Sequence, residues 1–382
     1  MAAADDVGDF WSNLSFLAGS LQHFRPLTQQ SSDGDLTQQR RSLVVLNLIE
    51  LHIMHVVEAI SNNQQPMLII PNRTSKTNSK KRIIFDINKP KSAMKFVQFI
   101  FILSQIYQLI RTDRICTKRD LFYRNVNLFK KQTVVDEIVD DVACWFRVSR
   151  NWLHVVATAK GLVSGDLKFY DGGKGNFVNC ADISQGFLIP SDTEHFSSLQ
   201  SNARFVLIVE KDAIFNKLLG TDLAARLKCI LITGKGFPDL NTRQLVAKIW
   251  IDLKLPILVL VDGDPYGIEI MCVYRFGSAS LQHECHRLIP SHVVRWLGLF
   301  PEDVENLNLN SLSDCVSPLT QIDKRFAEKL LERMKNNISI SRQIQILLRN
   351  NEKVELEALD KLGINYLSNV YLPNKIRFGG WI

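Results

Sequence analysis

The chain has 382 residues, more than one compact core usually holds, so we expect two domains. Hydrophobic residues make up 46% and charged residues 22%, which excludes a chain that is disordered throughout. A net charge of +7 and a pI near 9.0 favour a polyanionic partner. Seven cysteines without a C-x-x-C pair argue against a disulfide framework and a zinc ribbon. His283, Cys285 and His286 lack a partner cluster at zinc-site spacing, so we expect them to be structural.

Residues 1–92 contain no motif with recognisable chemistry, and we assign them, as a hypothesis, to partner binding. The acidic start of the chain does not fit a secretory signal, so export is not expected. Segment 42–60, SLVVLNLIELHIMHVVEAI, has the apolar spacing of a helix. The basic stretch 72–91 is interpreted as a loop or edge element around a short IIF strand. Within it, NSKKR at 78–82 is a weak nuclear-import signal.

Residues 93–185 have the pattern of a winged-helix domain, in which three helices precede a β-hairpin. Polar residues interrupt the apolar segment 94–110, which predicts a buried helix and no membrane contact. The three helices are expected to follow the N-caps Thr117, Thr133 and Ser149. The turn DGGKGN between LVSGDLKFY and NFVNC predicts the hairpin. Such domains place a helix on DNA, although similar helical hairpins also occur in protein-interaction domains.

Residues 200–382 alternate apolar strands with helical segments, which is typical of a parallel sheet covered on both faces. The expected strands are RFVLIV, KCILIT, PILVLV and MCVYRF. The last part of the chain is mostly helical in pattern, and LTQIDKRFAEKLLERMK is its clearest amphipathic helix. The predicted fold class is therefore mixed α/β.

Carboxylates follow two of these strands. Asp262 and Asp264 come after PILVLV, and Glu210 comes directly after RFVLIV. Ligands of open α/β sheets bind at the carboxyl ends of the strands. Hard oxygen donors of this kind suit Mg²⁺, so these residues are candidate metal ligands. The alternative is that they only cap the ends of strands.

Tyr123 lies in TKRDLFYRNVN, among the cations Lys118, Arg119 and Arg124. A phenol is a poor nucleophile unless nearby cations or a metal stabilise its phenolate. On a helix, Arg119 lies four residues before Tyr123 on the same face, where it can also orient a phosphodiester. The alternative is that Tyr123 is a packing residue, as most tyrosines are.

Six motifs between Thr117 and Leu299 resemble, in order, those of the topoisomerase VI A-subunit family, and more closely its eukaryotic branch, the meiotic DNA double-strand-break transesterases. They are TKRDLFY (117–123), VSRNWLHVVATAKGLVSG (148–165), VEKDAIF (209–215), TGKGFPD (233–239), VDGDPYG (261–267) and VRWLGL (294–299). The resemblance covers about half of the chain. It implies a winged-helix domain of the catabolite-activator type followed by a Toprim domain with a parallel sheet.

The resemblance implies that Tyr123 attacks a DNA phosphodiester and becomes linked to the 5′ end, with Arg119 as its basic neighbour. Glu210, Asp262 and Asp264 match the family's Toprim ligands for Mg²⁺. Phe122 replaces a second tyrosine found in many relatives, which leaves one hydroxyl in that dipeptide. Cations expected to contact DNA are Lys118, Arg124, Lys160 and Lys235.

The resemblance also implies partners. The tyrosine of one protomer works with the metal site of another, so we expect double-stranded DNA to be bound by a homodimer or by a heterodimer with a paralogous A-type protein. The enzyme class is an ATP-hydrolysing, type IIB-like type II topoisomerase whose ATP is bound by a separate B-like subunit. This chain lacks the P-loop sequence G-x-x-x-x-G-K-[ST]. The family implies a nuclear protein.

Two other functions stay open at this point. A Toprim hydrolytic nuclease would use the acidic residues while Tyr123 is incidental, and it would leave free 5′ phosphates. A non-catalytic DNA-binding scaffold subunit would keep the fold without using the site.

Overall fold

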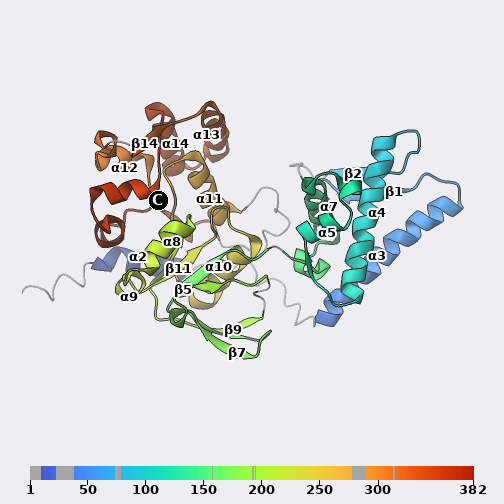
Figure 1. The fold of residues 1–382 in the computed structure, drawn as a ribbon, viewed down its shortest axis with the longest axis horizontal. Helices are drawn as coiled ribbons and strands as arrows, with labels where there is room; N and C mark the ends of the chain where they lie inside the picture. Colours follow the sequence, from blue (N-terminus) through green and yellow to red (C-terminus); the bar gives the residue numbers. More distant parts are fainter. Residues whose placement is uncertain are drawn as a thin grey trace, which may run out of the picture. The chain divides into compact units, whose positions relative to one another are not determined.

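The computed structural model describes residues 10–22, 38–73, 79–156, 158–191, 193, 195–277, 290–312 and 315–382. These residues fall into two compact units (Figure 1). The sheet unit consists of 10–22, 159–277 and the described residues from 290 onward, and the helical unit consists of 38–158. His283, Cys285 and His286 lie outside the described residues.

A six-stranded sheet forms the centre of the sheet unit. Its strands, in spatial order, are β13 (Val294–Gly298), β12 (Ile257–Leu260), β10 (Phe205–Val209), β11 (Cys229–Thr233), β5 (Leu162–Gly165) and β8 (Phe187–Leu188). The first four strands run parallel to one another, and β5 and β8 are antiparallel to their neighbours. Every residue of β10, β11 and β12 is buried, as continuous apolar runs in a doubly covered sheet require.

Helices and short strands surround this sheet. The helices are α2 (Ser12–Gln22), α8 (Asp212–Leu219), α9 (Leu223–Arg226), α10 (Leu240–Leu253), α11 (Pro265–Phe276), α12 (Pro301–Asn306), α13 (Gln321–Met334), α14 (Ile338–Asn350) and α15 (Leu372–Arg377). Two further strands, β14 (Val316–Pro318) and β15 (Glu352–Val354), pair with each other. The amphipathic helix expected near residue 320 is α13, whose first turn is held by a capping box between Thr320 and Asp323.

The expected strand MCVYRF is wrong, because these residues form the end of α11. Asp264 caps this helix and Pro265 occupies its first turn, so the chain turns helical directly after the acidic pair. Most of α11 is buried, and an apolar run of this kind has no period that separates strand from helix. The fourth parallel strand is β13, from the segment VRWLGL.

The predicted hairpin forms, but it belongs to the sheet unit. Its strands β6 (Lys168–Asp171) and β7 (Asn176–Asn179) make a small sheet with β9 (Phe196–Gln200). The preceding strand β5 pairs with β11 in the large sheet. The boundary between the compact units therefore falls near residue 158 rather than at 185, and this hairpin is not the wing of the helical unit.

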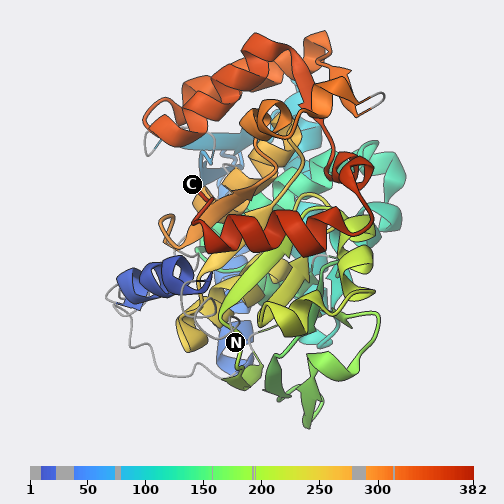
Figure 2. The same ribbon diagram turned by 90° about the vertical axis from the view of Figure 1, so that its left-hand side faces the viewer.

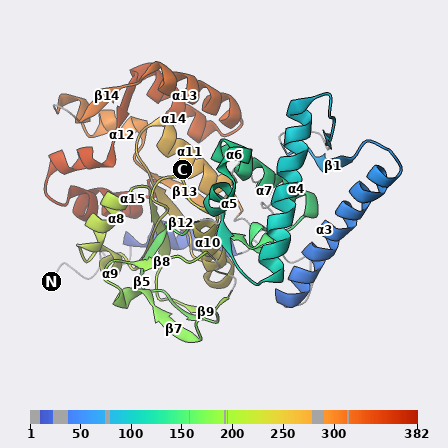
Figure 3. The ribbon, with the colours of Figure 1, turned by 45° about the vertical axis from the view of Figure 1, so that its right-hand side comes forward.

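The helical unit is built around two long helices, α3 (Gln38–Ser61) and α4 (Pro90–Arg111), which Figure 3 shows side by side. Its other elements are β1 (Met67–Pro71), β2 (Lys80–Ile84), β3 (Cys116–Thr117), α5 (Lys118–Arg124), α6 (Val126–Phe129), α7 (Gln132–Phe146) and β4 (Val155–Val156). Strands β1 and β2 form an antiparallel hairpin that contacts α7 and α4. A core of buried apolar residues from these helices holds the unit together.

Two of the three capped helices are present. Thr117 caps α5 through a capping box with Asp120, and Asn125 then caps α6. The helix α7 begins one residue before the expected cap Thr133. The helix expected after Ser149 is wrong, because only a short 3₁₀ turn forms there. His154 ends it in a left-handed conformation with φ of 56°, and β4 follows.

Both α3 and α4 are long and apolar enough to cross a membrane by length and composition alone. Helix α4 buries one apolar face in the core of the helical unit, as expected for segment 94–110. Helix α3 buries Val45, Ile49 and Val56, while its opposite face is also apolar and exposed. The absence of a membrane contact stays a prediction.

The N-terminal helix α2 does not belong with α3. It packs against α15 in the sheet unit (Figure 2), and its residues Leu14, Leu17 and Leu21 are buried in the core of that unit. The Nδ2 group of Asn13 also donates a hydrogen bond of 2.8 Å to the backbone oxygen of Arg377. The hypothesis of one N-terminal region over residues 1–92 therefore joins elements of both units.

Candidate active site

The carboxyl ends of β10 and β12 meet at one edge of the large sheet, because the two strands are parallel neighbours. Glu210 follows β10 directly, and Asp262 lies two residues beyond β12. The backbone N–H of Asp262 donates a hydrogen bond of 2.9 Å to Glu210 Oε2. The structure thus brings these two candidate ligands side by side.

Two carboxylates of this edge are buried, with 9% of Glu210 and 3% of Asp262 exposed, and Asp264 is half-buried. Burial, followed by repulsion from Asp262 and Asp264, raises the pKa of Glu210 to about 8. Burial also raises the pKa of Asp262 to about 6, and it raises the pKa of Asp264. A cation bound at this edge would therefore offset both the desolvation cost of the charged carboxylates and the repulsion between them.

The third carboxylate is fixed by a tight turn. Asp264 Oδ1 accepts a hydrogen bond of 2.6 Å from the backbone N–H of Gly267 and so caps α11. Two glycines allow this turn. A Cβ at Gly267 would lie 2.4 Å from the backbone oxygen of Asp262, and one at Gly263 would lie 2.7 Å from Val354 Cγ1. The spacing of VDGDPYG therefore follows from close backbone approach as well as from the acidic residues.

The described residues contain no ready-made cluster of three His, Cys, Asp or Glu side chains in metal-binding geometry. Backbone N–H groups and a lysine hold oxygens of Asp262 and Asp264 instead. The donor set itself fits Mg²⁺, because it places three carboxylates at one sheet edge, where burial and then repulsion from Asp262 and Asp264 raise the pKa of Glu210. We therefore regard the edge as chemically suited to that ion.

Tyr123 lies on α5 in the helical unit, and 60% of it is exposed. Leu121, two residues before Tyr123, is fully buried and packs this short helix into the core of the helical unit. The Cζ atom of Arg119 lies 5.8 Å from the centre of the Tyr123 ring. Hydrogen bonding to Tyr123 raises the pKa of Arg119, so the two side chains act as neighbours on one exposed face.

The other two cations near Tyr123 have partners within the helical unit. Lys118 Nζ donates to Asp140 Oδ1 at 2.6 Å, and this ion pair ties α5 to α7. Burial lowers the pKa of Lys118. Arg124 Nη1 donates a hydrogen bond of 2.8 Å to Gln105 Oε1. Lys118 therefore has a structural role, while Arg124 lies at the surface.

Lys160 and Lys235 lie together in the sheet unit. Lys160 Nζ donates to the backbone oxygen of Lys235 at 3.2 Å, and its backbone N–H donates to Asp239 Oδ2 at the same distance. Burial lowers the pKa of Lys160. Lys235 is exposed and makes an ion pair of 3.2 Å with Asp212. The motifs AKGLVSG and TGKGFPD thus meet in space although 75 residues separate the two lysines.

Comparison with known proteins gives the family of the chain. Residues 205–376 match the Toprim domain of the topoisomerase 6 A-subunit/Spo11 family, and residues 94–155 match the type IIB DNA topoisomerase model. The chain is 40% identical to the mouse (Mus musculus) meiotic recombination protein SPO11 over 91% of its length and 90% of the relative's. The chain belongs to the topoisomerase 6 A-subunit/Spo11 family.

Other members are similar over less of their length or at lower identity. The human (Homo sapiens) meiotic recombination protein SPO11 is 41% identical over 88% of each chain. The DNA topoisomerase 6 A-subunit of Arabidopsis thaliana is 37% identical over 74% of this chain and 65% of its own length. The Toprim match begins at β10 and ends in α15, so in this family member β5, β8 and α2 extend the sheet unit beyond it.

Sequence reasoning missed one part of the acidic edge, the C-terminal segment 352–357. The backbones of Gly263 and Val354 exchange hydrogen bonds of 2.9 and 3.2 Å. The backbone N–H of Leu356 donates to Asp262 Oδ1 at 2.9 Å. A local sign is the alternation of charged and apolar residues in EKVELE, but nothing in that pattern names its neighbour, which lies about 90 positions earlier in the chain.

Proposed function

We propose that this protein makes the DNA double-strand breaks that start meiotic recombination, as a topoisomerase-like transesterase of the nucleus. The observation that carries the proposal is the combination of an exposed Tyr123 beside Arg119 with a buried carboxylate edge on a Toprim sheet. Relatives named meiotic recombination protein SPO11 support the meiotic role.

In the proposed reaction, Tyr123 loses its proton and its Oη attacks the phosphorus of a DNA phosphodiester. A phosphotyrosyl ester forms at the 5′ end, the bond between phosphorus and the 3′ oxygen breaks, and that oxygen takes up a proton. Arg119 is placed to bind phosphate oxygens and to stabilise the phenolate. The ester conserves the bond energy that hydrolysis would release.

Glu210, Asp262 and Asp264 are the residues that would hold Mg²⁺. Bound there, the ion supplies positive charge to the phosphate and to the departing 3′ oxygen. The chain contributes the burial of Glu210 and Asp262 and the turn that fixes Asp264 at the start of α11. This arrangement favours a divalent cation over a neutral group at the edge.

The proposed assembly is a homodimer or a heterodimer with a paralogous A-type protein. Tyr123 and the carboxylates belong to different compact units of the chain. The tyrosine of one protomer would work with the metal edge of the other. Cleavage of both strands would then depend on dimerisation around the duplex, which protects DNA from an isolated chain.

The helical unit is proposed as a winged-helix DNA-binding domain that carries the nucleophile. Arg124, Lys160 and Lys235 are proposed to contact the DNA backbone, which positions the duplex without reading its sequence. Lys118 would act indirectly, since its ion pair with Asp140 holds α5 on α7.

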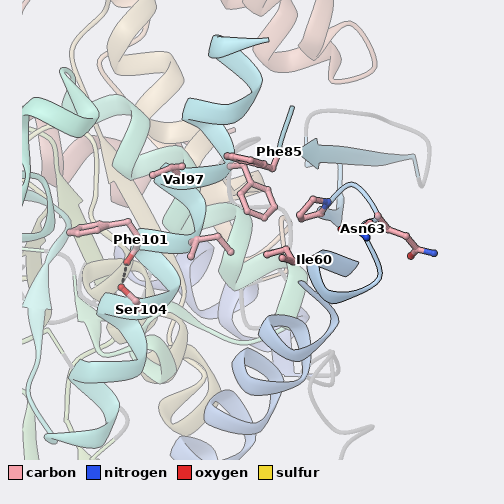
Figure 4. Close-up of a pocket in the computed structure, with 10 residues that line it drawn as sticks. Ile60, Asn63, Phe85, Val97, Phe101 and Ser104 are labelled. Carbon is pink, nitrogen blue, oxygen red and sulfur yellow. Dashed lines mark hydrogen bonds between the residues drawn. The ribbon is translucent and has the colours of Figure 1, made fainter. Parts of the chain in front are cut away.

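A B-like subunit is the proposed protein partner, since the Arabidopsis relative is named as the A-subunit of its enzyme. The exposed apolar face of α3 supports a protein partner in this part of the chain; its residues are Leu43, Val44, Leu51, Met54, Val57 and Ile60. At Ile60 this face continues into a groove of about 740 Å³ that is lined mainly by apolar side chains of α4 and Phe85 (Figure 4). ATP hydrolysis, as in type IIB enzymes, is assigned to that partner.

The test uses the chain with its B-like partner, duplex DNA and Mg²⁺. Cleaved 5′ ends that carry covalent protein, and that Tyr123→Phe abolishes, are the expected result. Free 5′ phosphates would support the hydrolytic nuclease instead. In cells that also contain a paralogous A-type protein, break formation that survives in an Asp262→Asn, Asp264→Asn double variant would favour the scaffold, because another chain would then make the breaks.

A further inference from the structure

Lys211 places a single ammonium group among three carboxylates at the acidic edge. Its Nζ lies 3.0 Å from Asp262 Oδ2, 2.8 Å from Glu355 Oε2 and 2.9 Å from Glu357 Oε2. An ammonium group has three N–H donors, so these contacts use all of them. Lys211 therefore links a proposed metal ligand directly to the C-terminal segment 352–357.

Both oxygens of Asp262 have partners in this arrangement. The backbone N–H of Leu356 holds Oδ1, and Lys211 holds Oδ2. The backbone contact is fixed by the neighbouring pairing of Gly263 with Val354. A cation that takes up Asp262 Oδ2 would therefore displace the side chain of Lys211 rather than the backbone of Leu356.

After displacement from Asp262, the ammonium group would still have two carboxylate partners. Glu355 and Glu357 belong to the surface end of the cluster, with 70% and 41% of their side chains exposed, while Asp262 is buried. Lys211 is a flexible side chain that can stay on these two glutamates after it leaves Asp262. The two glutamates thus offset part of the free energy that displacement would cost.

We propose that Lys211 is a positioning residue that pairs with Asp262 in the metal-free protein, and that it leaves Asp262 but stays on Glu355 and Glu357 when the divalent cation binds. The inference rests on the metal site of the proposed function. It makes the C-terminal segment 352–357 a determinant of metal affinity, although that segment supplies no ligand itself.

The test measures Mn²⁺ binding to the full chain by electron paramagnetic resonance, which requires no DNA cleavage. Lys211→Met removes the competing charge and keeps the length of the side chain, so Mn²⁺ should bind roughly five- to tenfold more tightly. Lys211→Arg keeps the charge and should stay within about twofold of the wild type. Unchanged or weaker Mn²⁺ binding by Lys211→Met would overturn the inference.

A double-mutant cycle between Lys211 and the two glutamates separates displacement of Lys211 from a general effect of charge on Mn²⁺ binding. The Glu355→Gln, Glu357→Gln pair removes the charges that hold Lys211 after it leaves Asp262, so Mn²⁺ binding should weaken roughly fivefold. In the Lys211→Met background the same pair should change binding by less than about twofold. Equal effects in both backgrounds would mean that the glutamates act on the metal independently of Lys211, and would overturn the inference.

Lys217→Met is the matched control. Lys217 lies on α8, the helix that begins directly after Lys211, and pairs with Asp360 rather than with Asp262. This variant should bind Mn²⁺ like the wild type, and a change equal to that of Lys211→Met would contradict a specific role for Lys211.

The Asp262→Asn, Asp264→Asn double variant defines the site itself. If it binds Mn²⁺ as tightly as the wild type, the proposed metal site and this inference both fall. If it loses Mn²⁺ while Lys211→Met behaves like the wild type, the inference alone fails.

Discussion

The acidic edge of the sheet and the tyrosine helix differ in how much of their geometry the fold itself demands. At the edge, Asp262 is buried and a glycine turn leaves no space for a Cβ. On α5, Tyr123 is mostly exposed, and only Leu121 is fully buried among the residues of that helix. Substitutions at the edge therefore change folding and chemistry together, whereas a substitution of Tyr123 reports on chemistry alone.

The largest expected effect is on cleavage by Tyr123→Phe. Loss of the proposed nucleophile should reduce covalent protein–DNA product by at least about a thousandfold. The free energy of unfolding should stay within about 0.5 kcal/mol, because the hydroxyl is at the surface. Tyr107→Phe, a tyrosine on α4 that bonds Glu50, is the control and should retain cleavage. A large loss of stability in Tyr123→Phe would contradict the contrast between the two regions.

Gly267→Ala, at the acidic edge, should lower the stability of the fold, in contrast to Tyr123→Phe. Its Cβ would lie 2.4 Å from the backbone oxygen of Asp262, so the turn must shift. We expect a loss of about 1–3 kcal/mol in unfolding free energy, measured by chemical denaturation. Gly19→Ala in α2 is the control, because nothing lies within 4 Å of its Cβ. That change should be neutral or stabilising by up to about 1 kcal/mol, and equal losses in both variants would refute the crowding argument.

Two capping boxes allow the tyrosine helix α5 to be compared with α13, a helix of the sheet unit. Thr117→Ala removes the cap of α5, and Thr320→Ala removes the equivalent cap of α13. Each should cost about 1 kcal/mol in thermal or chemical unfolding. Thr117→Ala should also lower cleavage, because α5 positions Tyr123, whereas Thr320→Ala should leave cleavage near the wild-type rate. Equal cleavage by the two variants would show that the start of α5 does not control the tyrosine.

The smallest effect expected is a loss of stability at alkaline pH. Burial raises the pKa of Cys180 from 9.0 to about 12 in the folded sheet unit. Below pH 9 both states hold the proton, and from pH 9 to 12 the unfolded chain holds fewer, so stability falls as pH rises. Between pH 8 and pH 10, under reducing conditions, Cys180 should account for a loss on the order of 1 kcal/mol in the free energy of unfolding. The stability of Cys180→Ala should fall less steeply with pH than that of the wild type. Parallel slopes of unfolding free energy against pH would exclude this thiol as the cause.

The sequence predicts the strands β10, β11 and β12 well because each is a short, continuous apolar run with clear ends. It also places Glu210 and Asp262 at one edge, since neighbouring parallel strands end together. It fails at α11, where burial on nearly all sides removes the helical period.

Long-range pairing explains the other failures. Nothing local in LVSG indicates that β5 joins the large sheet beside β11 rather than the helices before it. Likewise, Lys211 and Glu357 are 146 residues apart, so their ion pair is invisible to spacing rules. Tyr123 lies between these cases, because local pattern gives its helix and its cations, while its chemical role comes from the family motif.

The placement of α2 has a consequence for mapping functions by truncation. The chain leaves the sheet unit after α2, builds the helical unit and then returns to the sheet unit, so α2 and α15, the first and last helices of the described residues, share one core. Deleting everything before α3 would therefore remove Leu14, Leu17 and Leu21 from the Toprim side of the molecule. A defect in such a fragment would report damage to the sheet unit, which carries the proposed metal site, although the deletion was designed to test the helical unit. Internal deletions that spare α2 are the cleaner way to isolate what the helical unit does.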